Sequence, residues 1–275
     1  MDKLKKYNQK LLAILGTIAV VFLAGVTIAA AFLFIEQQVN RNRRLRNSNA
    51  ITLEDKRDKQ NNKLRDQIIT FESPHLIDTA NAIYMIPVST IDLDNPEIAN
   101  YDTYSNERNS TNFDSYGIQM PKHRSKSYHG SYNNIIIHHL KTNKQLSVFE
   151  NKVSIGNFGD YIVKDQQYIL IDAVSHDTNK DQKLSEKDLS AFFCYDLSSN
   201  QLNTVRIDNY SLVNYSPIYD SDQILLKFGF DKNEDGKYDP YKEPVELKTY
   251  SVSTNELKDL IDPAMQKKLQ KLLDD

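Results

Sequence analysis

The pattern D-x-N-x-D occurs twice, in Asp177-Thr-Asn-Lys-Asp-Gln-Lys-Leu-Ser-Glu-Lys-Asp188 and, 54 residues later, in Asp231-Lys-Asn-Glu-Asp-Gly-Lys-Tyr-Asp-Pro-Tyr-Lys-Glu243. This spacing points alternate oxygen-bearing side chains at one centre, as in calcium-binding loops of the EF-hand type. Each segment lies between two strand-like runs of apolar residues. The two loops therefore predict a repeated β structure with a bound cation at equivalent points.

Both loops supply oxygen ligands at the positions that such a loop uses. In the first loop the candidates are Asp177, Asn179, Asp181, Lys183 through its carbonyl, Ser185 and Asp188. In the second loop they are Asp231, Asn233, Asp235, Lys237 through its carbonyl, Asp239 and Glu243. The predicted cofactor is a structural Ca²⁺ that neutralises the carboxylates and holds a long hairpin turn in place.

Both loops also depart from the EF-hand pattern. Gln182 stands where the sharp turn favours glycine, a place that Gly236 fills in the second loop. Asp188 is shorter than the usual last glutamate. In the second loop that position is Lys242, and Glu243 follows one residue later. The alternative interpretation is a pair of Asp- and Asn-rich surface turns without metal.

An internal repeat surrounds the loops. The segment Ala191–Leu202 matches Glu246–Leu257, and Tyr168–Asp177 matches Asp222–Asp231. A weaker match at Ile135–Leu146 adds a third copy. The copies span about 74–150, 157–207 and 213–261, and each reads as strand, long turn, strand, short polar turn, strand. A recurring antiparallel unit of this length is typical of propeller blades, although a β-meander with similar hairpins would give the same pattern.

One stretch of the third copy carries a family resemblance. Tyr215-Ser-Pro-Ile-Tyr-Asp-Ser-Asp-Gln-Ile-Leu-Leu, followed by Val245-Glu-Leu-Lys-Thr-Tyr-Ser-Val-Ser-Thr-Asn-Glu-Leu257, resembles the propeller repeats of TolB-like proteins. The D-x-N-x-D-G insertion in a blade hairpin is also similar to variants of such repeats. The resemblance implies a propeller-like fold over about 70–261. Closed propellers have about 4–8 blades, so three copies predict an incomplete propeller or open arc, or one part of an assembly.

The N-terminal part is predicted to anchor the chain. Residues 1–10 are basic, and residues 11–35 contain no charged side chain. As a helix, that run is long enough to cross a bilayer, and it is longer than the apolar core of a cleaved signal peptide. It predicts an uncleaved transmembrane signal anchor, with a second copy as a possible partner through its small residues.

A polar stalk or linker is expected at 36–66 and the β-repeat domain at 67–261. Arginines follow the apolar run as closely as lysines precede it, so the charge rule for orientation is nearly tied. A short basic N-terminus usually stays inside, and loops with imperfect ligands fill more readily at extracytoplasmic calcium levels. The bulk of the chain is therefore expected outside the cytoplasm.

The last segment, 262–275, is predicted to form an amphipathic helix. Asp262 and Pro263 are typical of a helix start, and Met265, Leu269, Leu272 and Leu273 fall on one apolar face. We expect this face to pack on the β domain, with docking to a partner as the alternative.

Composition and motifs exclude several classes of function. The net charge of −3 gives no basic region for nucleic acid. The single cysteine, Cys194, lies in an apolar run typical of a buried, inert thiol. The sequence contains neither a nucleophile motif of the G-x-S-x-G type nor a phosphate-binding glycine loop, so no catalytic residues are predicted.

The sequence thus favours a membrane-anchored, calcium-binding β-repeat scaffold that interacts with a protein partner at the cell envelope. Two alternatives remain open. One is a propeller-type hydrolase or its accessory subunit, which needs carboxylates converging at one end of the blades. The other is a calcium-responsive sensor, which needs different conformations with and without calcium.

Overall fold

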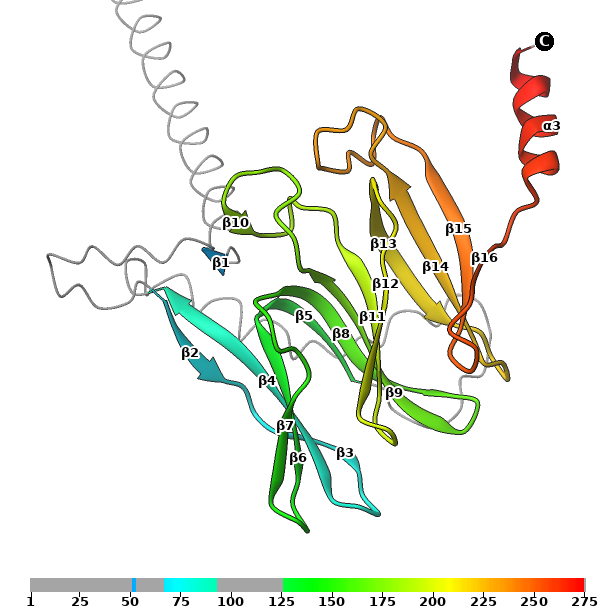
Figure 1. Ribbon diagram of the computed structural model, residues 1–275. Helices are drawn as coiled ribbons and strands as arrows, with labels where there is room; N and C mark the ends of the chain where they lie inside the picture. Colours follow the sequence, from blue (N-terminus) through cyan, green and yellow to red (C-terminus); the bar gives the residue numbers. More distant parts are fainter. Residues whose placement is uncertain (1–50, 53–66, 93–125, 275) are drawn as a thin grey trace, which may run out of the picture. The chain divides into compact units, whose positions relative to one another are not determined.

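The computed structural model describes residues 51–52, 67–92 and 126–274. All of them belong to one of the two units into which the chain divides, Ser48–Asp275. They form antiparallel β-sheets and one short helix (Figure 1). The mainly β class and its repeat-like sheet architecture are therefore confirmed.

The predicted anchor lies outside the described residues, as do the basic N-terminus and nearly all of the polar segment 36–66. Among the residues that are described, no helix has both the length and the apolar character needed to cross a bilayer. The transmembrane helix at 11–35 stays a prediction.

The first sheet is built around β4. Its strand order is β2-β4-β6-β7, and β3 also pairs with β4. β2 pairs with the C-terminal half of β4 and β3 with its N-terminal half. The strands are β2 (Gln67–Phe71), β3 (His75–Asp78), β4 (Ile83–Asp92), β6 (Asn134–His139) and β7 (Lys144–Ser147).

The second sheet has the order β12-β11-β9-β8-β5. Its strands are β5 (Ser127–Tyr132), β8 (Ser154–Val163), β9 (Gln166–Val174), β11 (Ala191–Asp196) and β12 (Gln201–Val205). The position of β5 differs from the sequence prediction, which assigned this stretch to the first copy. β5 instead pairs with β8 at the edge of the second sheet. In the first sheet β4 already has neighbours on both edges, β2 and β3 on one and β6 on the other.

The third sheet is a four-stranded meander in sequence order. It contains β13 (Tyr210–Pro217), β14 (Gln223–Phe230), β15 (Val245–Ser251) and β16 (Leu257–Asp259). A separate two-stranded ladder joins β1 (Ile51–Thr52) to β10 (Lys183–Leu184). This ladder ties the start of the described chain to the first D-x-N-x-D loop.

The internal repeat of the sequence is a repeat of structure between the second and third sheets. Tyr195 lies opposite Ile169, and 55 residues later Tyr250 lies opposite Ile224. Each tyrosine hydroxyl donates a hydrogen bond to an asparagine of the next turn, Asn200 at 3.1 Å and Asn255 at 2.6 Å. Both asparagines have positive φ, at 57° and 59°, which asparagine tolerates better than most residues.

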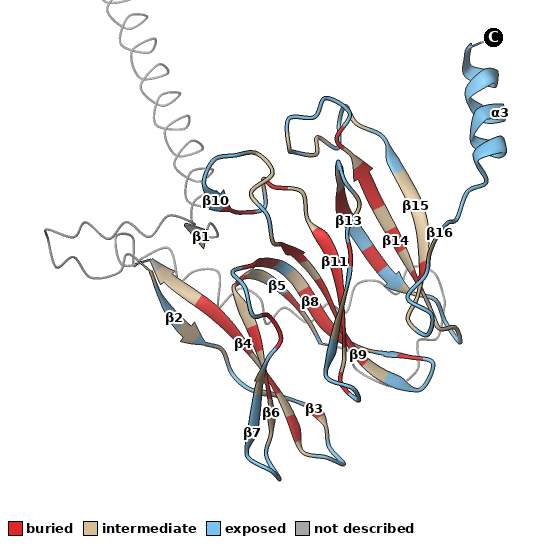
Figure 2. Ribbon diagram, viewed as in Figure 1, coloured by how far each residue is buried: buried red, intermediate tan, exposed pale blue. Residues whose placement is uncertain are grey.

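The second sheet is buried on both faces (Figure 2). Toward the first sheet, Ile169, Ile171 and Phe193 enter a core with residues such as Met85 and Ile137. On the opposite face, the alternate residues Leu170, Phe192 and Cys194 enter a core with residues of the third sheet. This burial explains why Ala191–Tyr195 is continuously apolar. Burial also raises the pKa of Cys194 to about 12, as expected of an inert thiol.

The C-terminal helix, α3 (Pro263–Asp274), begins where the sequence predicts. The Asp262 carboxylate accepts the Ala264 N–H at 2.7 Å and caps the helix. However, none of its residues is buried (Figure 2). The expected packing of its apolar face on the β domain is therefore not observed, and Leu272 and Leu273 are 67% and 82% exposed.

The turn asparagines allow a test of the repeat. We expect Asn200→Ala to lower the free energy of unfolding by about 2 kcal/mol, because alanine is strained at positive φ and the Tyr195 hydroxyl loses its acceptor. Asn200→Gly removes only the hydrogen bond and should cost about 1 kcal/mol. Urea unfolding of the full chain in detergent measures both. Equal stability of the two variants would contradict the strain argument.

Candidate functional site

The two predicted loops follow equivalent strands of neighbouring sheets. The first loop, 177–188, connects β9 to β11 and contains β10. The second loop, 231–243, connects β14 to β15. The structure therefore places both sets of predicted ligands at the same step of the repeat, as the sequence spacing indicates.

In the first loop, side-chain oxygens accept backbone N–H groups in sequence. The Asp177 carboxylate accepts the N–H of Asp181 at 3.0 Å and that of Gln182 at 2.7 Å. The Asn179 oxygen also accepts the Asp181 N–H at 3.0 Å. Asp181 in turn accepts the Lys183 N–H at 3.0 Å. These bonds curl the loop so that its oxygen side chains lie on the inside of the turn.

The second loop repeats this hydrogen-bond pattern. The Asp231 carboxylate accepts the N–H of Asp235 at 3.2 Å and that of Gly236 at 2.8 Å. The Asn233 oxygen accepts the Asp235 N–H at 3.1 Å, and Asp235 accepts the Lys237 N–H at 3.0 Å. These four equivalent bonds, made by the same Asp, Asn and Asp positions in both loops, indicate one backbone conformation.

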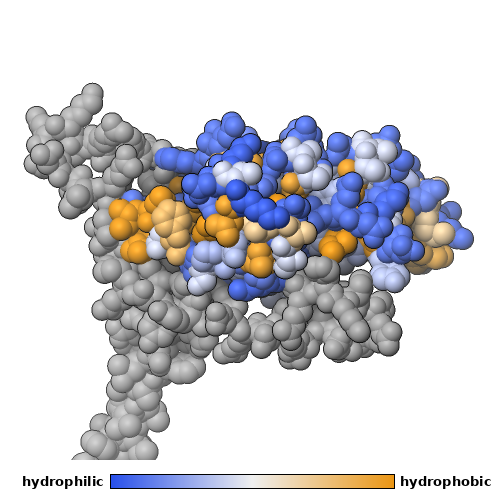
Figure 3. Space-filling model, turned by 90° about the horizontal axis from the view of Figure 1, so that it is seen from below, coloured by the Kyte–Doolittle hydropathy of each residue, from blue (hydrophilic) through white to orange (hydrophobic). Residues whose placement is uncertain are grey.

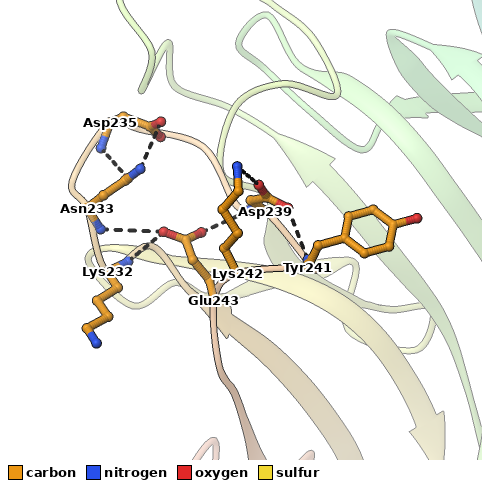
Figure 4. A network of polar contacts seen from close by, with 7 residues as sticks. All are labelled: Lys232, Asn233, Asp235, Asp239, Tyr241, Lys242 and Glu243. Atoms are coloured by element: carbon orange, nitrogen blue, oxygen red, sulfur yellow. Dashed lines mark hydrogen bonds and ion pairs between the residues drawn. The ribbon is translucent and has the colours of Figure 1, made fainter.

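The carboxylates that end the loops are also equivalent. Asp188 accepts the N–H groups of Thr178, Asn179 and Ser185 at 2.9, 3.2 and 3.0 Å. Glu243 likewise accepts those of Lys232, Asn233 and Asp239 at 3.0, 3.4 and 2.8 Å (Figure 4). Each carboxylate therefore ties the start of its loop to its later part. Glu243, and not Lys242, is the counterpart of Asp188, as the sequence suggested.

The sharp turn forms in both loops despite the glutamine in the first. Gln182 has a φ of 63° and Gly236 a φ of 76°. Glycine adopts this conformation without strain, whereas a glutamine side chain makes it unfavourable. The first loop thus keeps the conformation of the second at some cost in stability.

The loops contact each other, which the sequence did not reveal. The Thr178 hydroxyl donates to the carbonyl of Gly236 at 2.7 Å and accepts the Leu189 N–H at 2.8 Å. A methyl group on Gly236 would lie only 2.1 Å from the Thr178 carbonyl oxygen. Gly236 therefore serves both the turn and the close approach of the two loops. No local signal predicts this pairing, because the partners are 58 residues apart.

The loop carboxylates differ in their electrostatic surroundings. Asp231 and Asp188 are almost completely buried. Burial is the main cause that raises the pKa of Asp188, against the lowering effect of its backbone hydrogen bonds. In contrast, Asp239 is paired with the Lys242 ammonium at 2.9 Å (Figure 4), and that hydrogen bond lowers its pKa. Asp239 is thus the predicted ligand that already has a cation beside it.

Two of the remaining predicted ligands, Lys183 and Ser185, lie in the middle of the first loop. Lys183 lies in β10, opposite Thr52. Ser185 is buried and its hydroxyl accepts the Lys187 N–H at 3.3 Å. Within the described part of the chain, no group of three or more His, Cys, Asp or Glu side chains is arranged to hold a metal ion. The oxygen set of the loops also includes asparagine and backbone carbonyls, which are calcium ligands of another kind.

No protein-family model matches the chain. A search of curated proteins likewise finds no significantly similar sequence. The case for a function therefore depends on the geometry of the chain itself.

Substitution of each turn residue separately tests the loop geometry. We expect Gly236→Ala to destabilise the fold by about 2 kcal/mol or more, because the new methyl group collides with Thr178 and strains the backbone. Gln182→Gly should be neutral or stabilising by up to about 1 kcal/mol, because it removes the strain at positive φ. Thermal unfolding of both variants measures the difference. Destabilisation by Gln182→Gly equal to that of Gly236→Ala would contradict this account.

Proposed function

We propose that the chain is a membrane-anchored scaffold whose β-repeat domain is stabilised by Ca²⁺ in the two loops and presents its surface to a protein partner at the cell envelope. The observation that carries this proposal is the hydrogen-bond pattern shared by the loops at 177–188 and 231–243. The two loops share the residues Asp, Asn and Asp at the accepting positions and differ at the residues between them, and both turn the same oxygens inward. A shared ligand is the simplest physical reason for conserving that arrangement within one chain.

The donor chemistry fits a hard cation. Carboxylate, amide and carbonyl oxygens are the ligands that Ca²⁺ takes, in a flexible geometry that tolerates variation. Asp177, Asn179, Asp181 and Asp188 would hold the ion in the first loop, and Asp231, Asn233, Asp235 and Glu243 in the second. A bound ion would offset the repulsion between the carboxylates. This role is structural, because it holds two long hairpin turns in place.

Exposed apolar residues support the interaction part of the proposal. On β2, an edge strand of the first sheet, Ile69 and Phe71 are 59% and 57% exposed. Figure 3 shows exposed hydrophobic residues on the side of the molecule where the first sheet lies. The apolar face of α3 is also uncovered among the described residues. Apolar surface of this kind is typical of sites that bind a protein partner.

A calcium titration of thermal unfolding tests the scaffold proposal. The full chain, purified in detergent, is melted in EDTA and at increasing calcium. One site with free calcium at about 100 times its dissociation constant adds about 2.7 kcal/mol. For a domain of this size we expect a rise of about 5–11 °C in the melting temperature.

Charge-reducing variants assign the effect to the loops. Asp181→Asn keeps an oxygen that can accept the Lys183 N–H, yet should reduce the shift by removing a ligand charge. Asp231→Ala should abolish the contribution of the second loop. The control is Asp208→Asn, which changes an exposed carboxylate outside the loops and should leave the shift intact. No rise at millimolar calcium in the unaltered chain would refute the proposal.

The contact between the loops favours one second candidate, a calcium-responsive sensor. Ions in two loops joined through Thr178 and Gly236 would influence each other, because each would restrict the segment that the other must order. Such a sensor requires different conformations with and without calcium, and the coupling should give a Hill coefficient above one that Thr178→Val reduces. The same near-UV circular dichroism spectrum in EDTA and in calcium would leave calcium with a purely structural role.

The proposed orientation has a separate test. The domain lies outside the cytoplasm in this proposal, so a reporter enzyme that is active only after export should be active when fused after Asp275. A matched fusion with a reporter that is active only in the cytoplasm should be silent. The reverse pair of results would place the domain inside the cell.

A further inference from the structure

A pocket of about 210 Å³ lies between the first and second sheets, away from the two loops. One wall is β3 with the turn that follows it, including His75, Leu76 and Asp78. The other wall is the β8–β9 hairpin, which contributes Asp160, Ile162 and Gln167. Its lining therefore combines aliphatic side chains with acceptor groups.

Asp160 is the most buried of the ionisable residues that line the pocket. The residue is only 5% exposed. Its Oδ1 accepts the backbone N–H of Lys126 at 3.0 Å and lies 3.9 Å from Nε2 of His75. Among the described residues, His75 is the only ionisable base within ion-pair distance of this carboxylate.

Neither neighbouring base forms a close ion pair of opposite charges with Asp160 at neutral pH. Burial lowers the pKa of His75 below its ordinary 6.5, and this effect exceeds the opposite influence of Asp160. His75 is therefore mostly uncharged at pH 7. The Lys126 ammonium lies over the ring of Tyr128, 4.9 Å from its centroid. The pKa of Tyr128 is raised, mainly by burial and then by the negative charge of Asp160.

A buried carboxylate with no cation in direct contact is costly, and proteins normally pair such groups. Because Asp160 lines a pocket, a cationic ligand from solution can reach this carboxylate. We propose that this pocket binds an organic cation, a guanidinium or ammonium group on a short aliphatic stem, with Asp160 as its counter-ion. The site is independent of the calcium loops.

The walls fit such a ligand. Leu76 and Ile162 would cover the aliphatic stem. Gln167, which also lines the pocket, donates its amide N–H to the Ile77 carbonyl at 2.7 Å and carries a side-chain oxygen that can accept a hydrogen bond. The pocket has room for several water molecules and therefore for a compact cationic group. It is smaller than the range of about 300–1,000 Å³ that is usual for larger ligands.

This chemistry has two sources, a free small amine or an arginine or lysine side chain of a protein. Binding of agmatine and of the blocked peptide acetyl-Gly-Arg-Gly-amide to the full chain in detergent distinguishes them. Both are measured by calorimetry in EDTA at pH 7.5, so that calcium has no influence. Saturable binding of the peptide at least as tight as that of agmatine identifies a protein side chain. Agmatine binding alone identifies a free amine.

Matched variants locate the binding. Asp160→Asn keeps an acceptor for the Lys126 N–H but removes the charge, and should weaken binding about tenfold or more. Asp165→Asn is the control, because Asp165 is an exposed residue of the adjacent turn with a φ of 64° that asparagine tolerates. It changes the net charge equally and should bind as the unaltered chain does.

A second variant covers the case in which Asp160→Asn fails to fold. Ile162 is 44% exposed at the pocket, so Ile162→Trp should fill the pocket and abolish binding without disturbing the core. Equal binding by the unaltered chain and by Ile162→Trp would overturn the proposal. So would the absence of agmatine and peptide binding to the unaltered chain at millimolar concentration.

Discussion

The structure depends on one constraint, that the backbone N–H groups of two long turns need acceptors once the chain leaves a strand. Asp177 and Asp231 meet it, because each carboxylate accepts two N–H groups four and five residues ahead. Asp188 and Glu243 close the loops by accepting N–H groups from earlier positions. Each loop is thereby fixed by carboxylates at both ends, and the strands that flank it are held at a constant separation.

This constraint extends from the loops to the sheets. The first loop leaves the second sheet, and the second loop leaves the third sheet, so the Thr178–Gly236 contact joins neighbouring sheets outside their shared core. The second sheet is buried on both faces. It therefore loses the most apolar contact if the first or the third sheet moves. Loop geometry and core packing therefore stabilise the same arrangement, which explains why a strained Gln182 is tolerated.

The features that the sequence predicted are local. The D-x-N-x-D loops and the cap at Asp262 each depend on residues within a few positions of one another, and the repeat consists of two copies of such local patterns. The unpredicted features join distant segments: β5 with β8, Thr178 with Gly236, and His75 with Asp160. Spacing alone gives no information about such contacts. For α3 the periodicity correctly predicts a helix with an apolar face. The expected contact between that face and the β domain is not observed.

Asp231 and Asp160 show why two buried carboxylates of similar depth have different roles. Asp231 is 1% exposed and accepts two backbone N–H groups, one on each oxygen. Asp160 is 5% exposed and accepts one, beside an imidazole that is mostly uncharged at neutral pH. The free energy of burying charge is offset by hydrogen bonds in the first case and only partly in the second. The loop carboxylate is therefore held in place by its own backbone, where the proposed cation would bind, whereas the pocket carboxylate borders a cavity that a different ligand can enter.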